Sequence, residues 1–152
     1  MKLIDTTYDD YIKKDKIKSL HPKLKKVYKL FPDKIDNIKN LIFYGPKGVG
    51  KYTQMLTAIK QYSPSKLKYE KKICLTHNKN EYYYNISDIH LEVDMSLLGC
   101  NSKLLWNEIY NHYIDILSAK SHNIGFIVCK FYHEIHSELL DIFYSYMQTA
   151  LN

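Results

Sequence analysis

One stretch predicts most of the fold of this chain: Asn40-Leu41-Ile42-Phe43-Tyr44-Gly45-Pro46-Lys47-Gly48-Val49-Gly50-Lys51-Tyr52-Thr53. The apolar run 41–44 indicates a buried strand, since it is too short for a helix and a Gly-Pro turn closes it. From Lys51 onward, apolar residues recur at helical spacing until Ser63-Pro64 ends the element. The stretch therefore predicts a strand, a glycine-rich turn and a helix in direct succession.

The turn matches the phosphate-binding pattern G-x-x-x-x-G-K. Three of the chain's five glycines lie in it, where backbone N–H groups must approach phosphate oxygens and a Cβ would obstruct them. The lysine is predicted to reach the β- and γ-phosphates, aided by the partial positive charge of the helix N-terminus. The alternative is a glycine-rich turn that binds nothing. The predicted nucleotide-binding residues are Gly45, Pro46, Lys47, Gly48, Val49, Gly50, Lys51, Tyr52 and Thr53.

Tyr52 departs from the pattern, which places Ser or Thr after the lysine so that its hydroxyl can bind Mg²⁺. A phenol oxygen lies too far from the backbone to take that ligand position. Thr53 comes one residue later, which on a helix turns it about 100° away. Phosphate binding is favoured, whereas a normal magnesium site is not.

The composition suits one intracellular domain. With 152 residues, of which 45% are hydrophobic, the chain can bury a core. It has no run of 18 apolar residues, which would predict a membrane span, and no apolar signal region at its N-terminus. Cys74, Cys100 and Cys129 are predicted to be buried free thiols in a reducing compartment, the cytoplasm or the nucleus.

Charge is distributed unevenly along the chain. Residues 1–80 hold 19 lysines and 7 acidic residues, whereas residues 81–152 hold 3 lysines and 9 acidic residues. The basic half is compatible with a nucleic acid or nucleotide, and equally with an ordinary solvated surface. All 22 basic residues are lysine, so this chain can supply neither an arginine finger nor a bidentate arginine contact to phosphate.

The expected order of elements is strand, loop, helix, hairpin, strand, helix, strand, helix, which predicts an α/β layered domain with a parallel sheet. The single phosphate-binding domain 1–152 is predicted to comprise an N-terminal lead-in and helix over 1–38 and a sheet core over 39–152. The hairpin is expected at about 66–86, an alternating strand at 89–94, and a near-continuous apolar strand at 124–129.

With these motifs, the sequence resembles the clamp-loader AAA+ ATPases, specifically a small subunit of replication factor C of the type that is poor at hydrolysis and is also carried by large DNA viruses. The resemblance rests on the phosphate loop, the inserted hairpin, and the run Tyr84-Asn85-Ile86-Ser87-Asp88-Ile89-His90-Leu91-Glu92-Val93-Asp94 followed by Ser96 and Gly99. It covers most of residues 19–152. It implies a P-loop NTPase fold of the AAA+ or RecA-like type, truncated after the third core strand and its helix.

The family's second phosphate-site motif ends a strand with Asp-Glu, and the resemblance places Lys130 and Phe131 at these positions. An ammonium cannot bind Mg²⁺, and a phenyl ring cannot polarise water, so Lys130 could at most offset phosphate charge. Losing general-base assistance costs about 10²–10⁴-fold in rate, and losing an arginine finger about 10³–10⁵-fold. The resemblance therefore implies a nucleotide-binding, non-hydrolysing AAA+ subunit that holds ATP and has degenerate magnesium and catalytic positions.

The implied partners are other clamp-loader subunits, a sliding clamp and primer–template DNA in DNA replication, with no membrane. Two alternatives stay open: an active P-loop ATPase or small-molecule kinase, and a scaffold subunit whose loop is empty. The family's next strand would lie between 41–44 and 124–129. Either these two strands pair directly, as in nucleotide kinases, or the chain is a fragment with two exposed apolar strand edges; the fragment is favoured because the resemblance continues to the end of the sequence.

Overall fold

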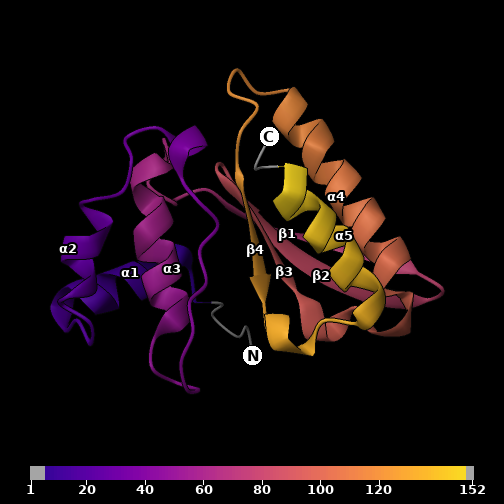
Figure 1. Cartoon of the computed structure of the whole chain (residues 1–152), viewed down its shortest axis with the longest axis horizontal. Coiled ribbons are helices and arrows are strands. Elements are labelled where there is room, and N and C mark those ends of the chain that lie inside the picture. The colour runs from indigo at the N-terminus through magenta and orange to yellow at the C-terminus, as the bar shows by residue number, and fades with distance from the viewer. Residues whose placement is uncertain (1–5, 150–152) are drawn as a thin grey trace. The chain divides into compact units, whose positions relative to one another are not determined.

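A four-stranded mixed sheet organises the C-terminal part of the computed structural model, which describes residues 6–149 (Figure 1). In spatial order its strands are β1 (Glu70–His77), β2 (Asn80–Ser87), β3 (His90–Asp94) and β4 (Phe126–Lys130). β2 runs antiparallel to β3, with Asn85 opposite Glu92, and β3 runs parallel to β4, with His90 opposite Phe126. The predicted α/β class is confirmed, but the prediction of a parallel sheet is wrong beyond the β3–β4 pair.

The hairpin between β1 and β2 turns at Asn78 and Lys79. Both residues have positive φ angles, 49° and 64°. Two successive left-handed residues define the tight turn whose twist matches paired strands, and asparagine tolerates that conformation better than most residues. The predicted hairpin is therefore confirmed, with its Asn-rich turn in the expected place.

One face of the sheet is apolar and is covered by α4 (Ser102–Ser118) and α5 (Ser137–Thr149) (Figure 1). Leu91 and Val93 of β3 are buried against this helical layer, and Trp106 of α4 is fully buried. Side chains alternate between the two faces of a strand, so this layer buries only every second strand residue. The helical spacing of Leu105, Ile109, Tyr113, Ile116 and Leu117 predicts an apolar stripe on α4. The structure confirms it: four of these residues are buried in the core, and Ile116 is partly buried against it.

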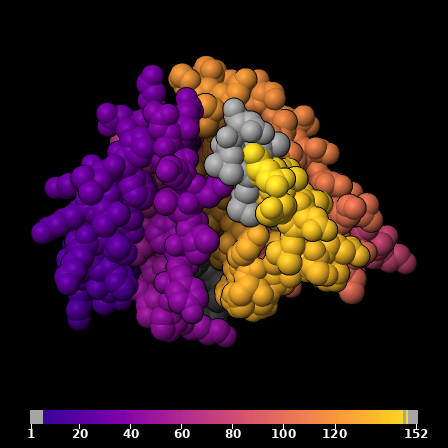
Figure 2. All heavy atoms as spheres, viewed as in Figure 1, coloured from indigo at the N-terminus to yellow at the C-terminus, as the bar shows by residue number. Residues whose placement is uncertain are grey.

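The outer side of α5 is at the molecular surface, where the space-filling view shows it in yellow (Figure 2). Tyr144 and Leu140 on this helix are exposed, whereas Leu139 is fully buried. The apolar residues 139, 142, 143 and 146 predict an amphipathic closing helix, and the burial of α5 agrees with that prediction.

Contacts divide the chain into two units, Met1–Glu70 with Ser87–Ile89 (unit 1) and Lys71–Ile86 with His90–Asn152 (unit 2). Unit 1 contains α1 (Tyr8–Ile17), α2 (Leu24–Tyr28) and α3 (Lys51–Ile59). The single-domain boundaries expected from the sequence stay a prediction. Short 3-10 helices span Ile35–Asn37, Lys60–Tyr62, Met95–Leu97, Gly99–Asn101 and Tyr132–Glu134.

The polar and charged sequence of residues 1–18 predicts a short irregular or weakly helical lead-in, but α1 is a regular helix. Thr7 and Asp10 form a capping box, in which each side chain accepts from the other residue's backbone N–H. One turn apart on the same face, Tyr8 and Ile12 are both buried. The cap and this short apolar pair are sufficient to define the helix.

A buried polar network connects the three helices of unit 1. The Tyr28 hydroxyl donates to Gln54 Oε1 at 3.1 Å, and Gln54 Nε2 donates to Asp15 Oδ1 at 3.0 Å. Burial, and to a smaller extent the negative charge of Asp15, raises the pKa of Tyr28 to about 12. The Tyr28 hydroxyl therefore remains a hydrogen-bond donor at neutral pH. For α2, the sequence predicts a short apolar face made of Leu24, Val27, Tyr28 and Phe31, but Val27 is about half exposed and does not belong to it.

The run 41–44 corrects the sequence prediction most clearly, because it is neither a strand nor buried. Ile42 is 92% exposed and Tyr44 is 96% exposed. A strand requires a partner for its backbone hydrogen bonds, and the sheet recorded for residues 6–149 contains only β1 to β4. High apolar content alone has not made this segment a strand.

The cysteines also differ from the prediction. All three are free thiols, but Cys74 and Cys100 are exposed, and Cys129 of β4 is partly buried. Burial raises the pKa of the Cys129 thiol to about 12.

Within residues 6–149, the helices lack the length and apolar content needed to cross a bilayer.

Candidate functional site

The glycine-rich loop leads directly into α3, as its sequence predicts. Gly48 and Gly50 have φ angles of 76° and 85°, in the left-handed region that L-residues with a Cβ rarely adopt. Gly50 is the N-cap of α3, and its carbonyl accepts the first helical hydrogen bond from the Gln54 N–H. These two glycines are therefore required by the backbone path.

Lys51 is the first residue of α3, and its side chain folds back onto the loop. The Nζ atom donates to the carbonyl oxygens of Gly45 at 2.6 Å and of Pro46 at 2.5 Å. Neither acceptor carries a formal charge, so the ammonium keeps its positive charge inside the loop, beside the positive end of the helix dipole. An anion in this loop would meet a preformed positive site.

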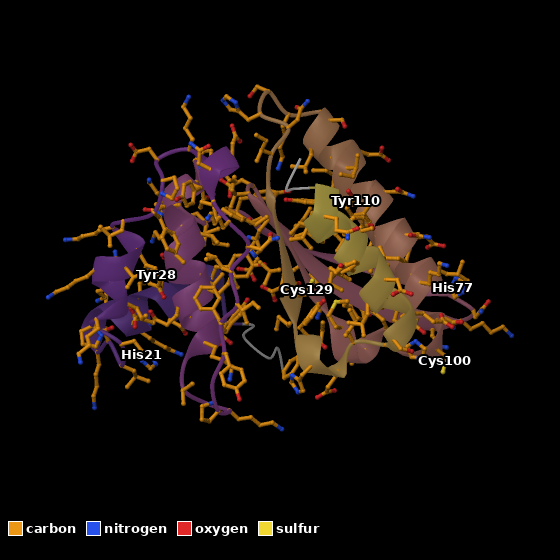
Figure 3. The ribbon with its side chains drawn as sticks, viewed as in Figure 1. His21, Tyr28, His77, Cys100, Tyr110 and Cys129 are labelled. Atoms are coloured by element: carbon orange, nitrogen blue, oxygen red, sulfur yellow. The ribbon has the colours of Figure 1, made fainter. Side chains whose placement is uncertain are left out.

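The N-terminal segment before α2 also contacts the loop. The carbonyl of Val49 lies 2.6 Å from the Nε2 atom of His21, a residue labelled in Figure 3. A Cβ built on Gly50 would lie 3.9 Å from Leu20 Cδ1. The sequence prediction missed this contact, and no local pattern could have indicated it because the two residues are 28 positions apart.

Tyr52 and Thr53 lie in the first turn of α3. The Tyr52 ring packs edge-on against the Tyr11 ring of α1, with the ring centroids 5.0 Å apart. The Thr53 carbonyl accepts from the Thr57 hydroxyl, one turn further along the helix. Tyr52 therefore packs α3 against α1, and its ring does not fit the magnesium ligand role that the position has in the pattern.

Lys130 and Phe131 belong to unit 2. The Lys130 Nζ atom lies 3.2 Å from Glu92 Oε1 on the neighbouring parallel strand, and His90 Nε2 lies 3.7 Å from Glu92 Oε2. Glu92 is 2% exposed and Lys130 is 34% exposed. Lys130 therefore neutralises a buried carboxylate, a role that the sequence prediction did not include.

Phe131 directly follows β4, in a conformation uncommon for its residue type. Its φ angle is +52°, and its side chain is about half exposed. The side chain offers no oxygen to a metal ion or to water. Among residues 6–149, no group of three or more His, Cys, Asp and Glu side chains could hold a metal ion. Phe131 therefore cannot take the water-polarising role that the resemblance gives to this position.

No family model matches this chain, and no curated protein matches it.

Proposed function

We propose that the chain binds a nucleoside triphosphate through residues 45–53 and does not hydrolyse it. The observation that carries this proposal is the placement of Lys51. Its ammonium lies inside a loop with two left-handed glycines, at the N-terminus of α3. Backbone N–H groups, a lysine and a helix N-terminus are the components that bind phosphate in nucleotide-binding loops.

The absence of hydrolysis follows from the residues at the expected metal positions. The Tyr52 ring contacts Tyr11, and the Lys130 ammonium is bonded to Glu92. The sequence offers no arginine to stabilise the charge that develops during phosphoryl transfer. Without the magnesium ligands and the arginine, ATP would bind and stay intact. The same replacements count against the alternative of an active P-loop ATPase or small-molecule kinase.

We further propose that the chain is a subunit of a clamp-loader-like complex in DNA replication, with other subunits, a sliding clamp and primer–template DNA as partners. This part depends on the resemblance in the phosphate loop and in residues 84–99. The positions of β2, β3 and the hairpin agree with the elements that the resemblance implies. The alternative of a scaffold with an empty loop gains some support from the exposed 41–44 segment, because a strand normally supports such a loop.

A lysine surface on unit 1 supports DNA as a partner. Asp15 is the only acidic residue between positions 13 and 29, and its side chain is only 6% exposed. Burial, and to a smaller extent repulsion by Lys16, lowers the pKa of Lys60 at the end of α3, so Lys60 is not counted in this positive surface. Lysines act as point charges that suit sequence-independent contact with phosphates. The surface consists of the exposed side chains of Lys13, Lys14, Lys16, Lys18, Lys23, Lys25, Lys26 and Lys29. Two of them have an acidic neighbour: Lys13 pairs with Asp9 at 2.6 Å, and Lys25 lies 3.9 Å from Asp15.

A titration with a fluorescent ATP analogue, with and without Mg²⁺, tests the proposed function. We expect saturable binding whose affinity changes little when Mg²⁺ is removed, because Tyr52 and Lys130 supply no ligand for the ion. In a parallel phosphate-release assay we expect no turnover above background. A turnover of about 1 s⁻¹, at the low end for phosphoryl-transfer enzymes, would establish the hydrolase alternative. An absence of binding at millimolar analogue would establish the scaffold alternative.

A further inference from the structure

The contact between His21 and Val49 joins two segments that are far apart in the sequence. Imidazole Nε2 and the carbonyl oxygen are 2.6 Å apart, within the range of a strong hydrogen bond. A carbonyl can only accept, so Nε2 carries the proton and donates it. His21 therefore holds the Val49 carbonyl in one direction.

Fixing this carbonyl also fixes the next N–H group in the loop. The peptide bond between Val49 and Gly50 is planar and trans, so its C=O and N–H point in opposite directions. While the carbonyl points toward His21, the Gly50 N–H points away from it. Gly50 precedes Lys51, so its N–H is one of the donors that a phosphate group in this loop would use.

Without such a contact, this peptide could rotate. Gly50 has no Cβ to disfavour one sign of φ, and a Cβ on Gly48 would meet nothing within 4 Å, so the neighbouring chain gives little resistance. Rotation would present a carbonyl, in place of an N–H group, to the anion.

We propose that His21 is a positioning residue of the phosphate loop, and that it presents the Gly50 N–H group to phosphate by holding the Val49 carbonyl. The proposal deepens the proposed function and rests on it for its biological meaning. His21 sets the fraction of loops in the binding orientation, and the apparent dissociation constant rises as that fraction falls. Loss of one neutral hydrogen bond predicts a weakening of ATP binding of about three- to tenfold.

The test compares His21→Gln with His21→Met in the full chain. Glutamine places an N–H donor at the same reach as imidazole Nε2, whereas methionine has similar length and no donor. We expect His21→Gln to bind ATP within about twofold of wild type, and His21→Met to bind about three- to tenfold more weakly by calorimetry. Equal affinities of the two variants, whether both unchanged or both reduced, would overturn the proposal.

A nuclear magnetic resonance measurement separates this proposal from the proposed function. Glycine-selective ¹⁵N labelling gives at most five amide signals, one for each glycine. We expect the Gly50 signal to shift and its amide to exchange faster in His21→Met, but not in His21→Gln, without any nucleotide. If wild type binds no ATP but this pattern appears, the positioning contact stands and the proposed function fails. If the Gly50 signal is the same in both variants, the contact does not orient the peptide.

Discussion

Lys130 occupies a position where the resemblance predicts a magnesium-binding aspartate, and its ammonium lies 3.2 Å from a carboxylate that is 2% exposed. Restoring the expected residue would therefore place a second negative charge beside Glu92. We expect Lys130→Asp to lower the free energy of unfolding by about 3 kcal/mol, the lower end for breaking a buried ion pair, because Lys130 is one-third exposed. Urea denaturation measures this change.

A compensating substitution provides the control for this prediction. Glu92→Gln removes the buried charge, so the double variant Glu92→Gln with Lys130→Asp is expected to regain at least half of the lost stability. Adding Phe131→Glu to Lys130→Asp is expected to raise ATP turnover little, because the chain has no arginine. If Lys130→Asp alone were as stable as wild type, the ion pair would not form in solution.

Of the helices and strands expected from the sequence, the strand at 41–44 differs most from the structure. Its composition favours a strand, but exposure of 92% at Ile42 indicates a solvated side chain. Ile42→Lys is therefore expected to change the free energy of unfolding by no more than about 0.5 kcal/mol. Leu56→Ala in α3, where the side chain is fully buried, is expected to cost about 2–5 kcal/mol under the same conditions.

The same substitution tests the exposed apolar surface. Wild type is expected to be poorly soluble and to bind a dye that fluoresces on apolar surfaces. Ile42→Lys is expected to bind less dye and to be more soluble. A loss of stability comparable to that of Leu56→Ala would show that residue 42 is buried in solution. The strand predicted from the sequence would then exist.

Local patterns predicted the elements that depend on local chemistry. The spacing of apolar residues located α3, α4 and α5, and the glycines of the loop located its left-handed turns. The same patterns could not reveal that residues 41–44 lack a partner strand among β1 to β4, because pairing depends on residues distant in the sequence. The contacts of His21 with Val49 and of Glu92 with Lys130, across 28 and 38 positions, were missed for the same reason.

The charge distribution of the whole molecule leads to a prediction about DNA. If the lysine surface contacts a phosphate backbone, binding of a labelled single-stranded oligodeoxynucleotide should weaken steeply with salt. The triple substitution Lys23, Lys26 and Lys29→Gln, around α2, is expected to reduce the slope of log K against log salt by about 2 units. Fluorescence anisotropy at several salt concentrations measures this slope.

The matched control removes the same charge from unit 2, through Lys71, Lys79 and Lys103→Gln. These residues are exposed and lie outside the lysine surface. The control is expected to leave the slope within about half a unit of wild type, since it removes no proposed phosphate contact. Equal effects of the two triple variants on the slope would mean that net charge alone attracts DNA. Binding of wild type to anionic vesicles in preference to DNA would instead assign the lysine surface to a membrane.

The most direct measurement of nucleotide binding is calorimetric titration of ATP into wild type, Lys51→Ala and Lys39→Ala. Each variant removes one positive charge, but only Lys51 has its ammonium inside the loop, bonded to the carbonyls of Gly45 and Pro46. Loss of a charge-assisted contact worth about 1.5–3 kcal/mol predicts roughly ten- to a hundredfold weaker binding for Lys51→Ala. Lys39→Ala should bind within about twofold of wild type, as expected for an exposed charge. Equal ATP affinity in wild type and Lys51→Ala would contradict nucleotide binding at this loop.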